Sequence, residues 1–173
     1  MDILTNLTAV LNSTPLRWTH LVEHTPDDLL RLQPAPGQWS ALGCLLHMVD
    51  MEDAIFASRV RAILAGENFP AFFPDETGSV LDDTMDAATL AQQFATKRAD
   101  SLILVGTLTS DDLVKTAVHG ELGEVSLSNL LHEWGGHDLM HLVQAEQAMM
   151  QPFIEGCGAW QSYFSDHVAK QGK

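Results

Sequence analysis

The sequence has few basic residues. Lys and Arg number 9 against 23 Asp and Glu, which gives a formal net charge of −14. Contact with nucleic-acid phosphates needs clustered Lys and Arg, and an anionic membrane surface attracts proteins through the same residues. We therefore expect a protein that binds neither nucleic acid nor a membrane. A strongly positive local site would need a metal ion.

Cysteines and long apolar runs are also scarce. Cys44 and Cys157 are far apart and form no CxxC pair, so no disulfide framework is indicated. Residues 1–12 carry an acidic residue where a signal peptide carries basic ones, and no window of about 18 uncharged apolar residues suggests a transmembrane helix. These absences predict a cytoplasmic protein.

Apolar residues are plentiful, at 46% of 173 residues, which is enough for one domain spanning residues 1–173 with a buried core. They recur at helical spacing in four segments, at about residues 2–24, 40–65, 86–108 and 126–150. An alternating pattern typical of strands is almost absent. The sequence predicts an all-α four-helix bundle with long connections and a packed C-terminal tail.

Prolines mark the expected bends and ends of these helices. Pro15 predicts either a kink or a break in the first segment, and Pro152 predicts that the last one ends near residue 150. The connector over residues 25–38 has room for one short helical turn, and residues 111–124 favour an extended piece. Trp160 and other aromatic residues predict that the tail packs on the body.

A long loop rich in phenylalanine is expected over residues 66–85. Phe69, Phe72 and Phe73 are apolar enough to require burial against something. Loops of this length in compact domains are either ordered by packing or functional. The loop is therefore pinned on the core, or it forms a lid or wall over a pocket.

The segment HEWGGHDLMHLVQ places His137 and His141 four residues apart. On a helix such residues stack on one face, here in the same stripe as Trp134. Two inward imidazoles are costly unless each has a partner, and one metal ion satisfies both. Ordinary hydrogen bonding in the core is the alternative. The HExxH protease mechanism does not apply, because Asp138 follows His137.

A third ligand must come from another helix. His47 lies beside the main apolar stripe of the second segment, where it either faces a cleft between helices or is partly exposed. His20 and His24 form a weaker pair at the same spacing near the end of the first segment. His119 and His167 are expected to be solvated.

Two stretches resemble a known family. PAPGQWSALGCLLHMVDMEDAIFASRVRAIL and the following FPAFFPDE resemble the first half of the DinB-like (DNA-damage-inducible) superfamily, in its DinB_2-type branch. SLSNLLHEWGGHDLMHLVQ resembles the second half, with its HDxxHxxQ pattern. The resemblance covers most of residues 10–150. The resemblance is fairly specific because three features occur together: the Trp-Ser helix start, the histidine seven residues after that serine, and the late HxxxH.

The resemblance implies a four-helix bundle, often dimeric, with a metal held by His47, His137 and His141. Despite its name the family does not bind DNA, which agrees with the acidic charge. Characterised relatives include transferases and isomerases that use bacillithiol, mycothiol or glutathione. A low-molecular-weight thiol as cosubstrate is therefore implied as well.

Three neutral imidazoles leave a coordination position open, as in catalytic zinc sites, and the ligand set suits zinc or nickel. The open position lowers the pKa of a bound water or thiol. Side chains expected to orient the ligands or line a pocket are Trp39, Cys44, Asp50, Trp134, Asp138 and Gln144. Each also has a plainer role, such as core packing for the tryptophans and a buried inert thiol for Cys44.

The leading hypothesis is a metal-dependent enzyme, a thiol-dependent S-transferase or a hydrolase, acting on a small electrophilic molecule. The alternative is a non-catalytic stress-response or ligand-binding protein with a structural metal. A pocket at the metal favours catalysis, whereas a fourth protein ligand favours the structural role. Met140 and Val143 are expected to lie opposite the histidines, where either a second copy in a homodimer or another helix of the same chain would cover them.

Overall fold

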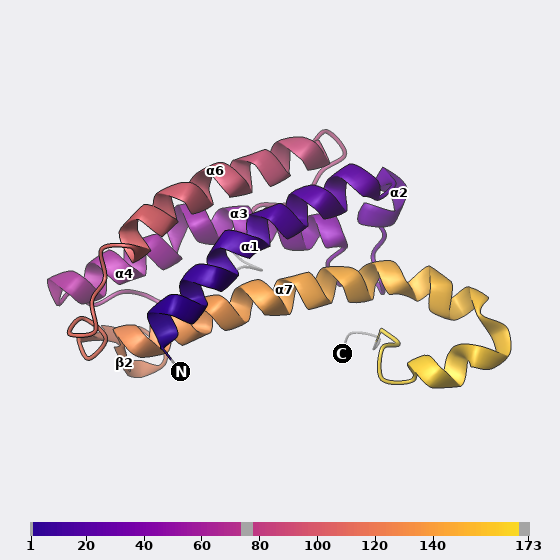
Figure 1. The fold of residues 1–173 in the computed structure, drawn as a ribbon. Coiled ribbons are helices and arrows are strands. Elements are labelled where there is room, and N and C mark those ends of the chain that lie inside the picture. Colours follow the sequence, from indigo (N-terminus) through magenta and orange to yellow (C-terminus); the bar gives the residue numbers. More distant parts are fainter. Residues whose placement is uncertain (1, 74–77, 170–173) are drawn as a thin grey trace.

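The structure, a computed structural model, describes residues 2–73 and 78–169 (Figure 1). Residues 74–77 of the phenylalanine-rich loop lie outside this range. In chain order the elements are α1 (Ile3–His24), α2 (Asp27–Leu30), α3 (Ala41–Ala54), α4 (Phe56–Ala65), α6 (Ala87–Val105), β1 (Thr116–His119), β2 (Gly123–Ser126), α7 (Leu127–Gly156) and the 3-10 helix η1 (Gly158–Phe164). None of the described helices is long and apolar enough to cross a membrane.

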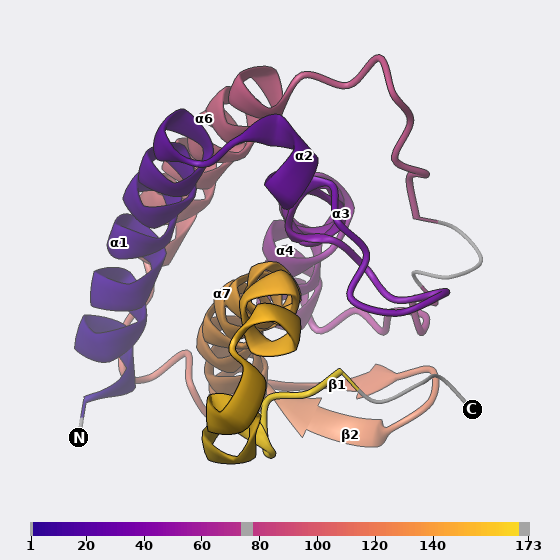
Figure 2. The ribbon, with the colours of Figure 1, turned by 90° about the vertical axis from the view of Figure 1, so that its right-hand side faces the viewer.

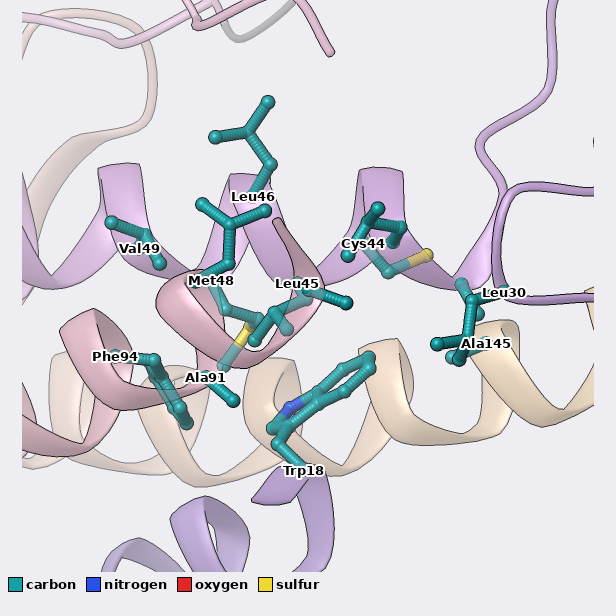
Figure 3. Close-up of a cluster of buried hydrophobic side chains, with 14 of the residues drawn as sticks. Trp18, Leu30, Cys44, Leu45, Leu46, Met48, Val49, Ala91, Phe94 and Ala145 are labelled. Atoms are coloured by element: carbon teal, nitrogen blue, oxygen red, sulfur yellow. The ribbon is translucent and has the colours of Figure 1, made fainter. Parts of the chain in front are cut away.

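The four long helical segments form the predicted bundle. Both α1 and α3 pack against α6 and α7, so that α1 lies diagonally across from α3 (Figures 1 and 2). Apolar side chains from all four segments meet in one buried cluster that includes Trp18, Leu45, Met48, Phe94 and Ala145 (Figure 3). These residues lie on the helical stripes of the sequence, because burial of one face is what stabilises an amphipathic helix.

Pro15 does not break the first helix, which is continuous from Ile3 to His24. A proline has no N–H and therefore leaves the carbonyl four residues earlier, that of Leu11, without its helical partner. The side chain of Arg98, on α6, fills this place with a hydrogen bond of 3.3 Å from Nη1 to the Leu11 carbonyl oxygen. The interruption in α1 is thus used to bind a neighbouring helix.

The second segment starts as predicted, with Ser40 Oγ accepting a hydrogen bond from the Gly43 N–H. The single helix expected to residue 65 is divided into α3 and α4 at Ile55, whose ψ is −71°. Backbone hydrogen bonds nevertheless continue on both sides of it, since Ile55 N donates to Met51 and Arg59 N donates to Ile55. The division is therefore a local distortion, and the segment ends at Gly66 in the left-handed conformation, with φ of 72°.

The predicted end of the last helix near residue 150 is wrong, because α7 passes through Pro152 and ends at Gly156. A proline in a helix removes one hydrogen bond at a cost of about 3 kcal/mol. Ile154 is buried beyond this proline, so that packing of the final turn offsets the lost bond.

The C-terminal tail is attached to the body by polar contacts. The Gln151 side chain donates to the His167 carbonyl and accepts from the Ala169 N–H, both at 2.9 Å. The expectation that the aromatic residues of the tail pack on the body is wrong for Trp160 and Tyr163, which are 65% and 79% exposed. The amide of Gln151 holds the tail, and the exposed rings of Trp160 and Tyr163 do not.

Residues 111–124, for which an extended piece was expected, contribute to an antiparallel hairpin in which Thr116 pairs with Ser126. The hairpin contacts α4 and α7 (Figure 2). Phe69 adds to it through hydrogen bonds from its N–H to Val118 and to its carbonyl from Gly120. Phe69 is buried, so this part of the loop is pinned on the body.

Two apolar side chains of α7 stay uncovered in the single chain. Met140 and Val143 are 53% and 62% exposed, so neither α1 nor α6 covers them. The expectation that Met140 lies opposite the histidines is wrong, because it lines a cavity together with His137 and His141. The homodimer remains a prediction.

Candidate metal centre

Three histidines from two helices converge inside the bundle. His137 Nε2 on α7 lies 3.1 Å from His47 Nε2 on α3 and 3.2 Å from His141 Nε2. Within residues 2–73 and 78–169 this is the one group of three or more His, Cys, Asp or Glu side chains whose ligand atoms all lie within 4.8 Å of one another. His47 and His141 are buried and His137 is partly buried.

Local helical geometry brings two of the three rings together. His137 and His141 are one turn apart and therefore share a face of α7. His47 lies seven residues after Ser40, the residue that caps α3, which fixes its position on that helix. The direct packing of α3 on α7 then brings the third ring to the other two.

The arrangement fits a metal ion. Three nitrogens that share a tetrahedral ion with bonds of about 2.0–2.1 Å lie about 3.3 Å from one another, close to the spacing here. His141 Nδ1 lies 2.8 Å from Gln144 Oε1, an oxygen that only accepts hydrogen bonds. Nδ1 therefore carries the proton, and Nε2 presents its lone pair to the other two rings.

The protonation states also suit a metal. Burial, helped by His141, lowers the pKa of His47 to about 4. Burial together with the two neighbouring rings lowers the pKa of His137 to about 3. Burial lowers the pKa of His141 too, against the Gln144 hydrogen bond that raises it. All three rings are thus neutral at neutral pH, which is the form that binds metals.

Three of the other predicted side chains lie at this centre. Trp39 covers it, with its ring centroid 4.7 Å from that of His47 and 5.8 Å from that of His141. Gln144 orients His141. Asp50 lies beside His47 in a cavity wall, but its carboxylate accepts from the N–H and Oγ of Ser79, at 2.7 and 2.8 Å, and so holds the loop and not an imidazole.

The other three lie in the core. Asp138 is fully buried and bonds Arg98 and not an imidazole, because it leaves α7 on a different side from His137. Trp134 stacks on Phe56 at 4.9 Å and is also fully buried. Cys44 lies within the apolar cluster, where burial raises the pKa of its thiol to about 12 (Figure 3). Of the two roles expected for Cys44, that of a buried, unreactive thiol fits this environment.

Sequence reasoning missed a buried ionic network next to the centre. Arg98 Nη1 and Nη2 donate to the two Asp138 oxygens at 2.6 and 2.9 Å, and Nη2 donates to Glu52 Oε1 at 2.7 Å. Glu52 also accepts from Ser101 Oγ at 2.7 Å and Trp134 Nε1 at 3.2 Å. With the Leu11 carbonyl, the network joins α1, α3, α6 and α7. Its signal in the sequence is an arginine on the apolar stripe of residues 86–108.

A cavity of about 340 Å³ opens onto all three histidines. Trp39, Met51, Phe72 and Met140 form its apolar wall, and Arg59, His119, Glu121 and Glu133 form its polar wall. A second cavity, of about 260 Å³, lies at Asp50 and shares Trp39 and His47 with the first. Phe72 therefore provides the pocket wall that was one of two roles expected of its loop.

The expectation that His119 is solvated is wrong, since it is only 8% exposed. Its ring meets Phe69 edge-on, with centroids 5.5 Å apart, and its Nδ1 accepts hydrogen bonds from two backbone N–H groups of the hairpin turn. Pairing of Phe69 with β1 creates this environment, and no local pattern predicts that pairing. His167, by contrast, is exposed as expected.

Comparisons with known proteins agree with the fold. A family model described as the DinB superfamily matches residues 11–145. A solved structure with TM-score 0.73 and 21% identity, covering 87% of both chains, is described as follows: "YfiT from Bacillus subtilis is a probable metal-dependent hydrolase with an unusual four-helix bundle topology". A search of curated proteins found no significant match. The likeness to YfiT shows the four-helix-bundle fold.

Proposed function

The chain belongs to the DinB superfamily, and on this basis we propose that it is an enzyme whose divalent metal ion is bound by His47, His137 and His141. The observation that carries the proposal is the convergence of three neutral Nε2 atoms at the wall of an open cavity. Zinc and nickel suit imidazole ligands of this kind. The metal dependence named for YfiT, which shares the fold, gives further support.

The reaction we propose is attack of an activated nucleophile on a small electrophilic molecule in the cavity. A bound divalent ion supplies Lewis acidity, which lowers the pKa of a water or thiol ligand. Water as nucleophile makes the protein a hydrolase, and a low-molecular-weight thiol makes it an S-transferase. The cavity of about 340 Å³ has room for a small substrate beside the histidines.

The side chains of the chain have separate tasks in this proposal. Gln144 keeps the Nδ1 proton of His141 in place, so that Nε2 stays free for the ion. Trp39 and Phe72 shield the site with apolar surface, which strengthens electrostatic interactions within it. Desolvation lowers the pKa of all three ligands and so keeps them neutral at neutral pH.

A purely structural metal is the alternative function. Structural zinc sites are closed by a fourth protein ligand. Among the described residues no Cys, Asp, Glu or fourth His joins the cluster. The cavity at the same place favours an exchangeable ligand and hence catalysis.

Elemental analysis of untagged protein tests the metal site. We expect about one divalent ion for each wild-type chain and almost none for His137→Ala, because the remaining two imidazoles bind far more weakly. The matched control is His20→Ala with His24→Ala, an exposed pair with the same spacing on α1, whose rings stack on each other 4.2 Å apart. A full equivalent of metal in His137→Ala, or loss of metal in the α1 control, would refute the assignment.

Gln144→Leu tests the orientation of His141. Removal of a hydrogen-bond partner of a ligand lowers metal affinity by about 10–100-fold, and we expect an effect of this size. Competition titration with a chelator of known affinity measures it. The control is Gln147→Leu. Gln147 lies one turn after Gln144 on α7, and its replacement should leave the metal affinity unchanged. Equal affinities of Gln144→Leu and wild type would contradict the proposed role.

A further inference from the structure

The cavity at the metal centre has a second polar feature, made by Arg59 on α4 and His119 at the end of β1. Both line the cavity, and both contact the same ring. The guanidinium carbon of Arg59 lies 5.2 Å from the Phe69 ring centroid, and the His119 ring meets Phe69 edge-on at 5.5 Å. Phe69 therefore holds the two side chains near each other.

His119 is a hydrogen-bond donor in this position. Its Nδ1 accepts from the backbone N–H groups of Glu121 and Leu122, at 3.1 and 3.2 Å, and so carries no proton of its own. The neutral ring must then carry its proton on Nε2. Burial, helped by Arg59, lowers the pKa of His119, which keeps the ring neutral at neutral pH.

Arg59 is one of only 9 Lys and Arg residues in the chain, and it is partly buried in the cavity wall. Contact with Phe69 and a hydrogen bond of 3.4 Å from Nη2 to the Pro70 carbonyl hold its guanidinium in place. Burial lowers its pKa, against the effect of Glu133. A fixed guanidinium presents parallel N–H groups that match the two oxygens of a carboxylate.

We propose that Arg59 and His119 form a carboxylate-binding subsite, so that the substrate of the metal site carries a carboxylate at one end and its reacting group at the other. This inference rests on the proposed function. Glu133 and Glu121 line the same cavity and act electrostatically on Arg59 and His119, so a carboxylate bound there must be held by direct hydrogen bonds that offset their repulsion. A substrate carboxylate reaches Arg59 only when the chain that links it to the group reacting at the metal has the matching length, so binding should depend on substrate length.

Binding of matched thiols to the Co²⁺-loaded protein tests the subsite. The probes are ω-mercaptocarboxylic acids with two to five carbons and the mercaptoalcohols of equal length, and the cobalt–thiolate absorption band reports binding. We expect the acid to bind about tenfold more tightly than the alcohol at one chain length, as a charge-assisted hydrogen bond provides. Arg59→Met and His119→Leu should each reduce this preference.

The matched control is Arg61→Met, an exposed arginine on the same helix, which should keep the preference. If Arg59 only anchors the loop, Arg59→Met lowers the melting temperature but leaves the ratio of acid to alcohol affinities unchanged. An unchanged ratio, or equal binding of the two series to cobalt-loaded wild type, overturns the subsite alone. Failure of the protein to take up cobalt overturns the proposed metal site and the subsite with it.

Discussion

Replacement of Arg98 by Met is expected to lower the free energy of unfolding by about 3–5 kcal/mol. Methionine fills much of the space but leaves the carboxylates of Asp138 and Glu52 buried without their cation. It also leaves the Leu11 carbonyl, freed by Pro15, without a donor. An unpaired charge in the interior costs far more than a lost surface pair, because water cannot reach it.

Urea denaturation of metal-free protein measures this effect. The control is Arg17→Met, which removes an exposed ion pair with Glu146 at 3.7 Å and should cost less than about 1 kcal/mol. A triple variant, Arg98→Met with Asp138→Leu and Glu52→Leu, should recover part of the lost stability, since it removes the buried charges together. If Arg98→Met lowers the free energy of unfolding no more than Arg17→Met does, the buried ionic network does not stabilise the fold as proposed.

Metal-free protein is expected to lose stability as the pH falls from about 6.5 towards 4. Burial lowers the pKa of His47 to about 4 and that of His137 to about 3, from the ordinary 6.5 that each has in the unfolded chain. Within this window the unfolded chain binds protons that the folded protein does not. Each histidine then favours unfolding by up to about 1.4 kcal/mol per pH unit, and by less where solvent screens it. The loss of folding stability caused by these two histidines is absent above pH 6.5 and grows as the pH falls.

Unfolding by urea at several pH values, with a chelator present, measures this dependence. Carboxylates also titrate in acid, so the informative quantity is the difference between wild type and a His47→Gln, His137→Gln double variant. The variant should show a shallower loss of stability between pH 6.5 and 4. His20→Gln with His24→Gln, both exposed on α1, should follow wild type. Parallel curves for wild type and the first double variant would disprove this effect of the two histidines.

The bundle was largely predictable from the sequence because each helix carries its own apolar stripe. Capping side chains at Ser40 and Ser126 also set two helix starts locally. The end of α7 was not predictable, since it depends on whether the turn beyond Pro152 finds a place to pack. The tail is attached to the body as predicted, but its contact with the amide of Gln151 was not predictable, because it depends on where the chain lies after α7.

At the centre, the HxxxH spacing alone placed His137 and His141 on one face of one helix. Their meeting with His47 depends on the rotation of α3 against α7, which spacing within either helix does not determine. The resemblance to a family supplied that pairing in advance, and the structure brings the three rings together. Asp138 shows that a neighbour in sequence need not be a neighbour in the site. It follows His137 in the chain, yet its carboxylate accepts a hydrogen bond from Arg98 on α6.

By itself, the sequence determined the helices and their buried faces, because hydrophobic periodicity and capping are local properties of the chain. Tertiary structure alone decided that Arg98 ties four helices together and that a loop and a hairpin bring Arg59 and His119 to the cavity. The contacts of Arg98 join residues 40 or more positions apart, and His119 meets Phe69 across 50 positions. Their energies depend on distance and burial in space, which no local pattern records.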